Sequence, residues 1–274
     1  MKQKKIIFRD AEIIEFCRTT RDTNEIHDPV CMSKLGKRVI VPGMFALSQT
    51  VALSGDFMKS KARSLRVLFN SLLSSGDFVT LCAGSSDVDP EEIRLSAINH
   101  RDTLTSNNDY TRLSGKEIGF THKDNGILRR LEVEREQVER FRTLIGTDDA
   151  DIARFLYSVA YASQALLQCI DNPVTEVEKE IDRVICKSSN VSPFYHTLEI
   201  QIPSPFPVFE PLGTLDYLVH FERKKPFKLY VAHVSCAHDG ILIFRAQYKL
   251  VGIADRIILR MAKPVTHGFF TRDV

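Results

Sequence analysis

The chain has 274 residues, of which 37 are Lys or Arg and 35 are Asp or Glu, so its formal net charge is +2. This length can form one large hydrophobic core or two smaller ones. The content of 43% hydrophobic and 26% charged residues is typical of a globular protein. The near-neutral balance disfavours a dedicated nucleic-acid binder, which needs a concentrated basic surface. The basic run from Lys2 to Lys5 is predicted to be a solvated end.

The cysteines and the N-terminal residues indicate the cellular compartment of the protein. No two cysteines have the Cys-x-x-Cys spacing of zinc ribbons and redox pairs, which favours free thiols in a reducing compartment. The N-terminus lacks the apolar run of a signal peptide, and no apolar stretch reaches the length of a membrane-spanning helix. We therefore expect a cytoplasmic protein without membrane insertion. The six cysteines are Cys17, Cys31, Cys82, Cys169, Cys186 and Cys236.

The first half of the chain predicts two helices followed by strands. Asp10 is expected to cap a helix over residues 11–20, and the next segment is expected to be a loop. Pro42 suits the first turn of a second helix that is apolar on most sides and ends at Gly55, so this helix should be buried. Strands are predicted over 65–73, 78–83 and 93–99, with turns at 74–77 and 87–90 and a hairpin plus connection over 101–128.

The second half repeats this order. Helices are predicted over 136–144 and 153–170, and the charged residues 132–136 are interpreted as a helix face. Strands are predicted over 197–202, 215–221, 229–235 and 241–251. A proline-rich loop at 203–213 separates the first two of them. The repeated order of two helices and an antiparallel meander indicates an internal duplication. We predict an α+β fold with one unit at 1–115 and a second at 128–274.

The most specific feature lies between the first two predicted helices. Asp22 and His27 supply an acid and a base, and Gly43 opens the predicted buried helix about fifteen residues later. An acid, a base and free N–H groups at a helix N-terminus are the parts needed to move a proton beside a polarised carbonyl. Alone, Asp22 could cap a turn and His27 could be a structural loop residue, as Asp28 is expected to be a turn former. The combination favours a catalytic site.

These residues also carry a family resemblance. The stretch Asp22-x-Asn24-x-Ile26-His27-x-Pro29, followed by Val39-Ile40-Val41-Pro42-Gly43-Met44, resembles the hydratase-2 motif of MaoC-like hot-dog proteins. That family includes (R)-specific enoyl-CoA hydratases and β-hydroxyacyl dehydratases. The resemblance is close over about thirty residues, and the remaining chain agrees in the order of its elements. It implies a double hot-dog fold, in which each long central helix is wrapped by an antiparallel sheet.

The resemblance also implies roles for individual residues. Asp22 and His27 match the catalytic pair, Asn24 matches the asparagine that orders the loop, and Gly43 matches the oxyanion donor. The flanking Val41, Pro42 and Met44 are expected to contact substrate. No cofactor and no metal are implied. The second half has neither a His nor a Pro-Gly between its two helices, so we expect one active site, in the first half.

The chain departs from the family pattern at three positions. Glu25 follows Asn24 where the family usually has Pro, and Pro42 replaces the His before Gly43. Val51 stands about where the family often carries a serine, with Ser48 and Thr50 nearby. Pro42 leaves the Gly43 N–H intact, so it is compatible with an oxyanion role.

Three basic residues between the motif and the buried helix are candidates for binding the carrier of the substrate. Lys34, Lys37 and Arg38 could receive the phosphates of coenzyme A or the acidic face of an acyl carrier protein, or they could belong to a solvated loop. His233 and His238, near Asp239, are expected to flank a hairpin rather than bind a metal.

Three functions remain open from the sequence. The first is a hydro-lyase that hydrates enoyl thioesters or dehydrates (R)-3-hydroxyacyl thioesters. The second is an acyl-CoA thioesterase, in which water attacks the carbonyl at the same oxyanion site. The third is a non-catalytic protein that binds acyl thioesters. A homodimer of double hot-dogs is possible in each case. No Gly-x-Gly-x-x-Gly, Walker-type or Gly-x-Ser-x-Gly motif occurs, which disfavours nucleotide-binding and serine-hydrolase classes.

Overall fold

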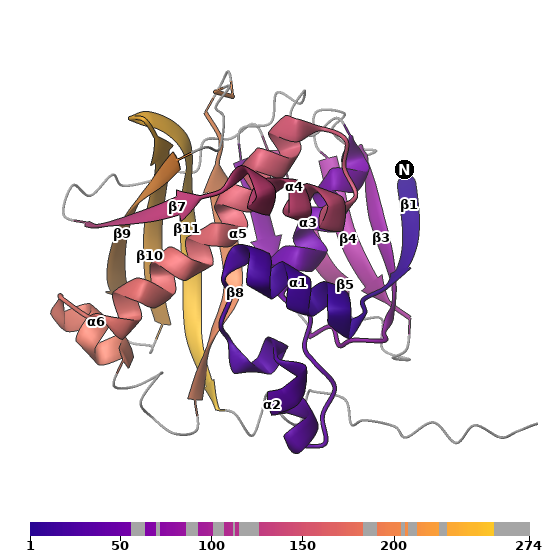
Figure 1. Cartoon of the computed structure of the whole chain (residues 1–274), viewed down its shortest axis with the longest axis horizontal. Coiled ribbons are helices and arrows are strands. Elements are labelled where there is room, and N and C mark those ends of the chain that lie inside the picture. Colours follow the sequence, from indigo (N-terminus) through magenta and orange to yellow (C-terminus); the bar gives the residue numbers. More distant parts are fainter. Residues whose placement is uncertain are drawn as a thin grey trace, which may run out of the picture.

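The computed structural model consists of antiparallel sheets covered on one side by helices (Figure 1). It describes residues 1–55, 64–69, 72–85, 93–100, 107–111, 113–114, 126–182, 191–203, 206–207, 213–224 and 229–254. The predicted turn at 87–90, much of the connection within 101–128 and Cys186 lie outside the described residues. Within them, the predicted α+β class is confirmed.

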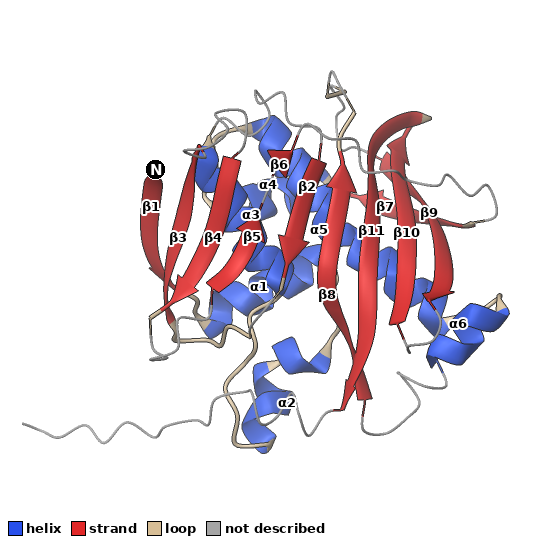
Figure 2. Cartoon of the chain, turned by 180° about the vertical axis from the view of Figure 1, so that it is seen from behind, coloured by secondary structure: helices blue, strands red, loops and turns tan. Residues whose placement is uncertain are grey.

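The strands belong to two sheets that lie edge to edge. The four-stranded sheet has the order β1-β3-β4-β5 and the seven-stranded sheet the order β6-β2-β8-β11-β10-β9-β7. Because β5 lies beside β2, the strands form one row when the molecule is seen from behind (Figure 2). The strands are β1 (Lys2–Ile7), β2 (Ser64–Leu68), β3 (Phe78–Ser85), β4 (Ile93–Asn99), β5 (Asn107–Thr111), β6 (Leu113–Ser114), β7 (Ile127–Val133), β8 (Val191–Gln201), β9 (Gly213–Lys224), β10 (Leu229–His238) and β11 (Ile241–Ala254).

Two central helices lie against this row of strands. Helix α3 packs on β1, β3 and β4, and α5 packs on β7, β9 and β10. The helices are α1 (Asp10–Thr20), the 3-10 turn η1 (Glu25–His27), α2 (Pro29–Lys34), α3 (Gly43–Ser54), α4 (Arg135–Ile145), α5 (Ala150–Asp171) and α6 (Glu176–Ile181). The remaining long helices, α1 and α4, pack on each other and on α3 and α5.

The limits of α3 follow from its sequence. Pro42 occupies the N-cap with extended backbone, so the helix begins at Gly43. Gly55 ends it in the left-handed region with φ of 70°, a conformation that costs glycine little. Phe45, Leu47 and Val51 on this helix are fully buried, which confirms the prediction of a buried helix.

The order and pairing of elements repeat between the halves. The series β1, α1, α3, β2, β3, β4, β5 corresponds to β7, α4, α5, β8, β9, β10, β11. Each edge strand pairs with its half's second meander strand, β1 with β3 and β7 with β9, and the halves meet where β2 pairs antiparallel with β8. This agrees with an internal duplication. The unit limits of 1–115 and 128–274 stay a prediction.

The helices of the two halves share an aromatic core. Phe16 of α1 stacks on Phe45 of α3 with ring centres 4.7 Å apart, and Phe16 also contacts Phe141 of α4 at 5.8 Å. Phe141 in turn lies edge-on to Tyr157 of α5 at 5.5 Å. One aromatic ring from each of the four helices therefore takes part in the contact between the halves. Ring contacts of this kind stabilise the fold beyond the burial of apolar area alone.

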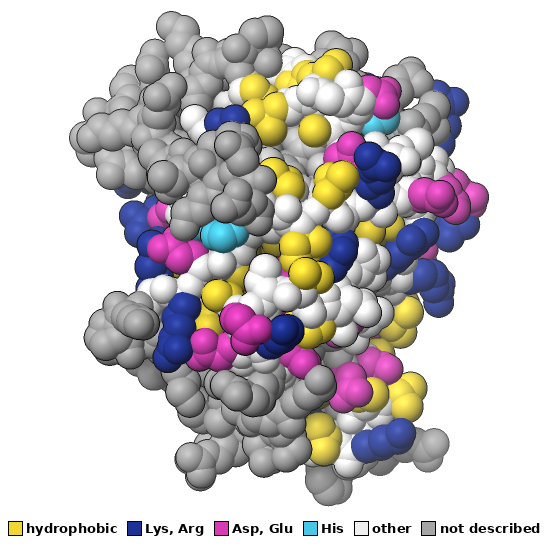
Figure 3. Space-filling model, turned by 90° about the vertical axis from the view of Figure 1, so that its left-hand side faces the viewer, with side chains coloured by type: hydrophobic (Ala, Val, Ile, Leu, Met, Phe, Trp, Pro, Cys, Tyr) yellow, Lys and Arg dark blue, Asp and Glu magenta, His cyan; other side chains and the backbone are white. Residues whose placement is uncertain are grey.

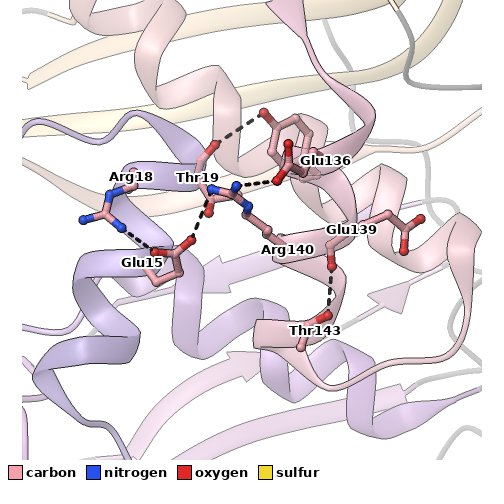
Figure 4. A network of polar contacts seen from close by, with 8 residues as sticks. Glu15, Arg18, Thr19, Glu136, Glu139, Arg140 and Thr143 are labelled. Carbon is pink, nitrogen blue, oxygen red and sulfur yellow. Dashed lines mark hydrogen bonds and ion pairs between the residues drawn. The ribbon is translucent and has the colours of Figure 1, made fainter.

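Ion pairs on the surface join the same two outer helices. Figure 4 shows Arg140 of α4 between Glu136 of its own helix and Glu15 of α1, which is 3.9 Å away. Glu15 also pairs with Arg18 at 2.8 Å. Exposed pairs of this kind contribute little individually, so the contact between these helices rests mainly on the aromatic core.

The basic N-terminal run has a structural role that the sequence did not predict. It forms the edge strand β1, and its side chains are mostly exposed, as expected for a solvated end. Lys2 Nζ donates to the carbonyl of Ser54 at 2.9 Å, at the C-terminus of α3. Lys4 Nζ lies 3.6 Å from the position that a Cβ on Gly146 would take, at the C-terminus of α4. Cations stabilise helix C-termini, so Lys2 helps to hold the edge strand against the end of α3.

Other local predictions are corrected. Arg9, not Asp10, is the N-cap of α1, and Asp10 is its first residue. The predicted loop after α1 contains η1 and α2. The charged segment 132–136 is not a single helix face, because its first residues end β7 and Glu134 caps α4. Helix α6 was not predicted.

Two further observations concern the cysteines and the helices. The described cysteines are all free thiols. No helix in the described ranges is long and apolar enough to cross a membrane.

Candidate active site

The loop that carries the motif starts from a defined helix end. Arg21 follows α1 in the left-handed conformation with φ of 53°, and its N–H donates to the carbonyl of Arg18. The N–H of Asp22 then donates to the carbonyl of Cys17 at 2.9 Å. These two bonds form a Schellman motif, so the backbone of Asp22 is fixed by the end of α1.

Asn24 makes two hydrogen bonds in the next turn. Its N–H donates to Asp22 Oδ1 at 3.1 Å, and its own Oδ1 accepts from the Ile26 N–H at 3.3 Å. Both are local side-chain-to-backbone bonds of the Asx type. Glu25 occupies the first position of η1 within this turn. The turn therefore forms without the proline that the family usually has there.

His27 is held through one ring nitrogen. Its Nδ1 lies 2.7 Å from the carbonyl oxygen of Ile40, which can only accept, so Nδ1 carries a proton. In the neutral imidazole, Nε2 is then the free base. Nε2 lies 3.8 Å from Asp22 Oδ2, and the two side chains are 10% and 16% exposed. This separation is too long for a direct hydrogen bond but lets one water or hydroxyl oxygen contact both atoms.

The thiol of Cys17 lies close to this pair but is not a nucleophile. Burial, with Asp22 and Asp28 nearby, raises the pKa of this thiol. It stays protonated near neutral pH, so the chemistry of the loop rests on the carboxylate and the imidazole.

The residue that holds His27 leads directly into α3. Ile40 is three residues before Gly43, so their Cα atoms are at most about 11 Å apart. Val41 N–H donates to the carbonyl of Leu73 at 2.8 Å, and Val41 and Pro42 are buried. The segment therefore connects the base to the N-terminus of α3 through a short, fixed path.

The N-terminus of α3 has free donors. The first helical bonds run from Phe45 and Ala46 to the carbonyl of Pro42. For the N–H groups of Gly43 and Met44, no acceptor lies among the described residues. Free N–H groups and the positive end of the helix dipole can stabilise a developing oxyanion. This fits the role expected of Gly43.

Gly43 is required by packing as well. A Cβ there would lie 2.6 Å from Cε1 of Phe69, a ring that is 8% exposed. The ring covers one side of the helix start and leaves no room for a larger residue. Phe69 was not predicted as part of the site, because its contact with Gly43 spans residues far apart in sequence.

The start of α5 differs from that of α3. Asp149 caps α5, and its Oδ1 accepts from the N–H groups of Asp151 and Ile152 at 2.9 and 3.0 Å. The counterpart of the free Met44 N–H, that of Asp151, is therefore occupied on α5, whereas the counterpart of the Gly43 N–H, that of Ala150, has no acceptor among the described residues. The second half thus has a helix start capped by a carboxylate and lacks the acid–base pair.

The three basic candidates have different environments. Arg38 pairs with Asp77, which is fully buried and also accepts from Ser74 N–H and Asn99 Nδ2. This engagement takes Arg38 out of the expected binding set. Lys34 is exposed in the last turn of α2, and Lys37 is half-buried.

The central helix has a buried hydroxyl near the position of the family's serine. Ser48 is fully buried, and its Oγ has no partner among the described residues. Thr50 Oγ1 donates to the carbonyl of Ala46 at 2.7 Å, and Val51 is fully buried. Ser48 is thus an available hydroxyl in the middle of α3, and Ser54 Oγ at the end of the helix is likewise without a partner among the described residues.

Arg21 is a further residue that the sequence did not single out. Its guanidinium carbon lies 5.8 Å from the ring centre of Tyr161 on α5. Burial raises the pKa of the Tyr161 phenol, and Arg21 lowers it. The left-handed conformation costs a residue other than glycine about 1–2 kcal/mol, whereas an exposed cation–π contact returns about 0.5–1 kcal/mol.

A cleft of about 490 Å³ lies elsewhere, along β1 and the end of α4. None of the residues that line it belongs to the Asp22–His27 loop. Basic side chains predominate over acidic ones in the lining, which consists of Lys4, Lys5, Ile6, Ile7, Phe8, Arg9, Glu12, Gln49, Phe78, Thr143, Leu144 and Gly146. On the opposite edge of the molecule, over β7, β9 and α6, basic, acidic and apolar side chains are intermixed (Figure 3).

Two histidines of the second half, His233 and His238, have protein partners. His233 Nε2 lies 3.3 Å from Glu222 Oε2, and His238 Nδ1 donates to the carbonyl of Thr214 at 3.1 Å. Asp239 and Gly240 form the tight turn of the β10–β11 hairpin, both with positive φ, as expected for these residues. In the described part of the chain, no three His, Cys, Asp or Glu side chains gather as a metal site.

Comparison with known proteins identifies the fold. No protein-family model and no curated protein sequence match the chain. A MaoC-like dehydratase from Phytophthora capsici superposes with a TM-score of 0.52, covering 91% of this chain and 94% of that chain at 10% identity. The full-length peroxisomal multifunctional enzyme type 2 from Drosophila melanogaster gives 0.51, covering 91% of this chain and 48% of that chain at 11% identity. A putative oleoyl thioesterase from Lactobacillus plantarum gives 0.44, covering 91% of this chain and 94% of that chain at 8% identity, too low to carry an argument.

At these identities the likeness establishes the fold alone. The predicted double hot-dog fold is confirmed, and the resemblance to MaoC-like proteins is confirmed at the level of the fold.

Proposed function

We propose that this protein is a hydro-lyase that adds water to enoyl thioesters, or removes it from (R)-3-hydroxyacyl thioesters, at one site in its first half. The observation that carries the proposal is the Nδ1 bond of His27 to Ile40, which leaves Nε2 as a base 3.8 Å from Asp22. The same segment leads to the free N–H groups of α3. A base, an acid and an oxyanion site are thereby linked by a few residues.

The reaction needs a water held between the pair. One of Asp22 and His27 takes a proton from this water as its oxygen bonds to C3 of the enoyl group. The electrons of the double bond move toward the thioester carbonyl, whose oxygen gains negative charge opposite the Gly43 N–H. The proton taken from the water is then passed on by the pair to C2, so both side chains return to their starting protonation states. Dehydration follows the same steps in reverse.

Each part has a known range of effect. A positioned acid or base contributes about 10²–10⁴ in rate, and one oxyanion donor about 10²–10³. The Asp22 and His27 side chains are mostly buried, which strengthens their electrostatic interactions with a bound substrate. Ser48 adds a buried hydroxyl on the same helix.

Substrate and carrier recognition is assigned to residues around this centre. Val41, Pro42 and Met44 flank Gly43 and are buried, so they suit the thioester and the start of the acyl chain. Lys34 and Lys37 are proposed to meet the phosphates of coenzyme A or the acidic face of an acyl carrier protein. A homodimer and a cytoplasmic location remain predictions from the sequence.

The test uses crotonyl-CoA and a series of longer trans-2-enoyl-CoA substrates with the full chain. Loss of absorbance of the conjugated thioester measures hydration, and Lys179→Gln, on exposed α6, serves as the matched control. Asp22→Asn and His27→Ala should each lower kcat by roughly 10² or more. If both variants were as active as the wild type, the proposal would be wrong.

The same reactions separate the two alternatives. Release of free coenzyme A, followed with a thiol reagent, would identify a thioesterase. Tight binding of acyl-CoA without turnover would identify a non-catalytic binding protein.

A further inference from the structure

The corresponding helices α1 and α4 end in the same motif but with different residues. After α4, Gly146 is left-handed with φ of 69°, and the N–H groups of Gly146 and Thr147 donate to the carbonyl of Arg142 at 3.1 and 3.4 Å. After α1, Arg21 takes the place of Gly146 and Asp22 that of Thr147. The bonds are equivalent, so the first half carries an arginine where the backbone favours glycine.

The stability of the helix end does not explain this arginine. Glycine adopts the left-handed conformation without the clash of a Cβ, and Asn or Asp can bond locally there, whereas the long Arg side chain cannot. The contact with Tyr161 returns no more than the backbone conformation costs. A strained residue held beside a candidate catalytic residue points to a functional reason for its side chain.

The side chain of Tyr161, which the Arg21 guanidinium contacts, is held in place by its surroundings. It is fully buried, and its hydroxyl donates to the carbonyl of Glu132 in β7 at 3.2 Å. Its ring centre is 5.3 Å from that of Tyr157, whose hydroxyl lies 3.4 Å from the carbonyl of Thr19. Helix α5 of the second half thus contacts the last turn of α1 and the side chain that precedes Asp22.

We infer that Arg21 is a positioning residue, through which Tyr161 of the second half holds Asp22 in its orientation toward His27. The inference rests on the proposed function. It gives the second half, which has no acid–base pair of its own between its helices, a part in the site of the first. Arg21 acts through the backbone it shares with Asp22, because its contact with Tyr161 restricts the αL residue that precedes the Asp22 N–H bond to Cys17, a restriction that glycine would lack.

The decisive variant is Arg21→Gly. It keeps the Schellman motif and removes the contact between Arg21 and Tyr161, called the tether below. We expect an unchanged or higher thermal midpoint, a kcat lower by roughly tenfold to a hundredfold, and a KM within about twofold of wild type. Arg18→Ala, on the exposed side of the same helix, removes a side chain that pairs with Glu15, and this matched control should keep wild-type kcat. Wild-type kcat in Arg21→Gly would overturn the inference.

Variants of the partner separate the tether from a loss of packing. Tyr161→Phe keeps the aromatic face and should keep most of the activity, whereas Tyr161→Leu should lower kcat as Arg21→Gly does. The kcat of the double variant Arg21→Gly/Tyr161→Leu should be no lower than that of the less active single variant, because both changes break the same contact. Additive losses in the double variant would contradict the tether.

A measurement that does not depend on enzyme activity tests this inference separately from the proposed function. Hydrogen exchange of peptides over residues 22–28 reports the bonds of Asn24 and Ile26 in the loop. Arg21→Gly should speed exchange there and leave residues 147–153 unchanged. If the wild type turned over none of the thioesters, the proposed function would fail, while faster exchange would still support the tether. Unchanged exchange over 22–28 would overturn it.

Discussion

The imidazole of His27 donates from Nδ1 to the carbonyl of Ile40, 2.7 Å away, and Ile40 N–H donates back to the carbonyl of Ile26 at 3.0 Å. The loop that carries His27 and the segment that enters α3 are therefore joined by two hydrogen bonds, one from the imidazole ring and one between backbone groups. Ile40 belongs to the buried stretch that enters α3 at Gly43. The base and the helix start are held in one unit, so the position of His27 can be tested apart from its basicity.

His27→Asn and His27→Gln divide these two roles. The amide nitrogen of Asn can take the place of Nδ1 and keep the bond to Ile40, whereas that of Gln matches Nε2. Both variants lack the base, so kcat should fall by about 10²–10⁴ in each. His27→Asn should keep the wild-type free energy of unfolding, and His27→Gln should lose about 1–3 kcal/mol because the buried Ile40 carbonyl loses its donor. Denaturant unfolding and steady-state kinetics measure both effects. Equal stability of the two variants would contradict the role of the Nδ1 bond.

A pair of double variants tests the oxyanion role of the Gly43 N–H. Gly43→Ala alone should destabilise by about 1–3 kcal/mol, because its Cβ would meet Phe69. Phe69→Ala removes this clash, so Gly43→Ala/Phe69→Ala folds with the N–H in place. Gly43→Pro/Phe69→Ala has the same space but no N–H, and Pro is well tolerated in the first turn of a helix. The proline variant should have a kcat lower by about 10²–10³ than the alanine variant. Equal kcat values would show that this N–H does not act on the substrate.

The sequence predicts best what local chemistry determines. The start of α3 after Pro42 and its end at Gly55 follow from two residues with fixed backbone preferences, and both are confirmed. The turn at Asp239 and Gly240 is confirmed for the same reason. In contrast, β1 was missed because its lysines lack an apolar alternation, and its pairing with β3 is a contact between distant segments.

The candidate site shows the same division. The acid, the base and the glycine were found because they lie in one short motif. Arg21 gave no signal, since a left-handed arginine is visible only in three dimensions and its partner Tyr161 is 140 residues away. Arg38 was misjudged for a related reason, because Asp77, which neutralises it, belongs to the turn before β3.

The three basic residues near the motif should behave differently on substitution. Arg38→Leu leaves the buried Asp77 charge without its guanidinium, so the free energy of unfolding should fall by about 3–5 kcal/mol. Lys34→Ala, at an exposed position, should stay within about 0.5 kcal/mol of wild type and raise the KM for a coenzyme A thioester by about two- to fivefold. Urea unfolding and initial rates measure the two effects. A Lys34→Ala variant with unchanged KM for both carriers would remove Lys34 from the binding set.

The start of α5 gives the last prediction, on the number of active sites. Asp149→Ala removes the carboxylate that accepts from Asp151 and Ile152 N–H, so the free energy of unfolding should fall by about 1 kcal/mol. For a chain of this length, the thermal midpoint should drop by about 2–4 °C. Asp149→Asn keeps a capping oxygen and is the matched control. Both variants should keep kcat within about twofold of wild type, because the second half has no acid–base pair at this helix start. A tenfold loss of kcat in Asp149→Ala alone would mean that the α5 N-terminus takes part in the reaction, and the single-site proposal would then be wrong.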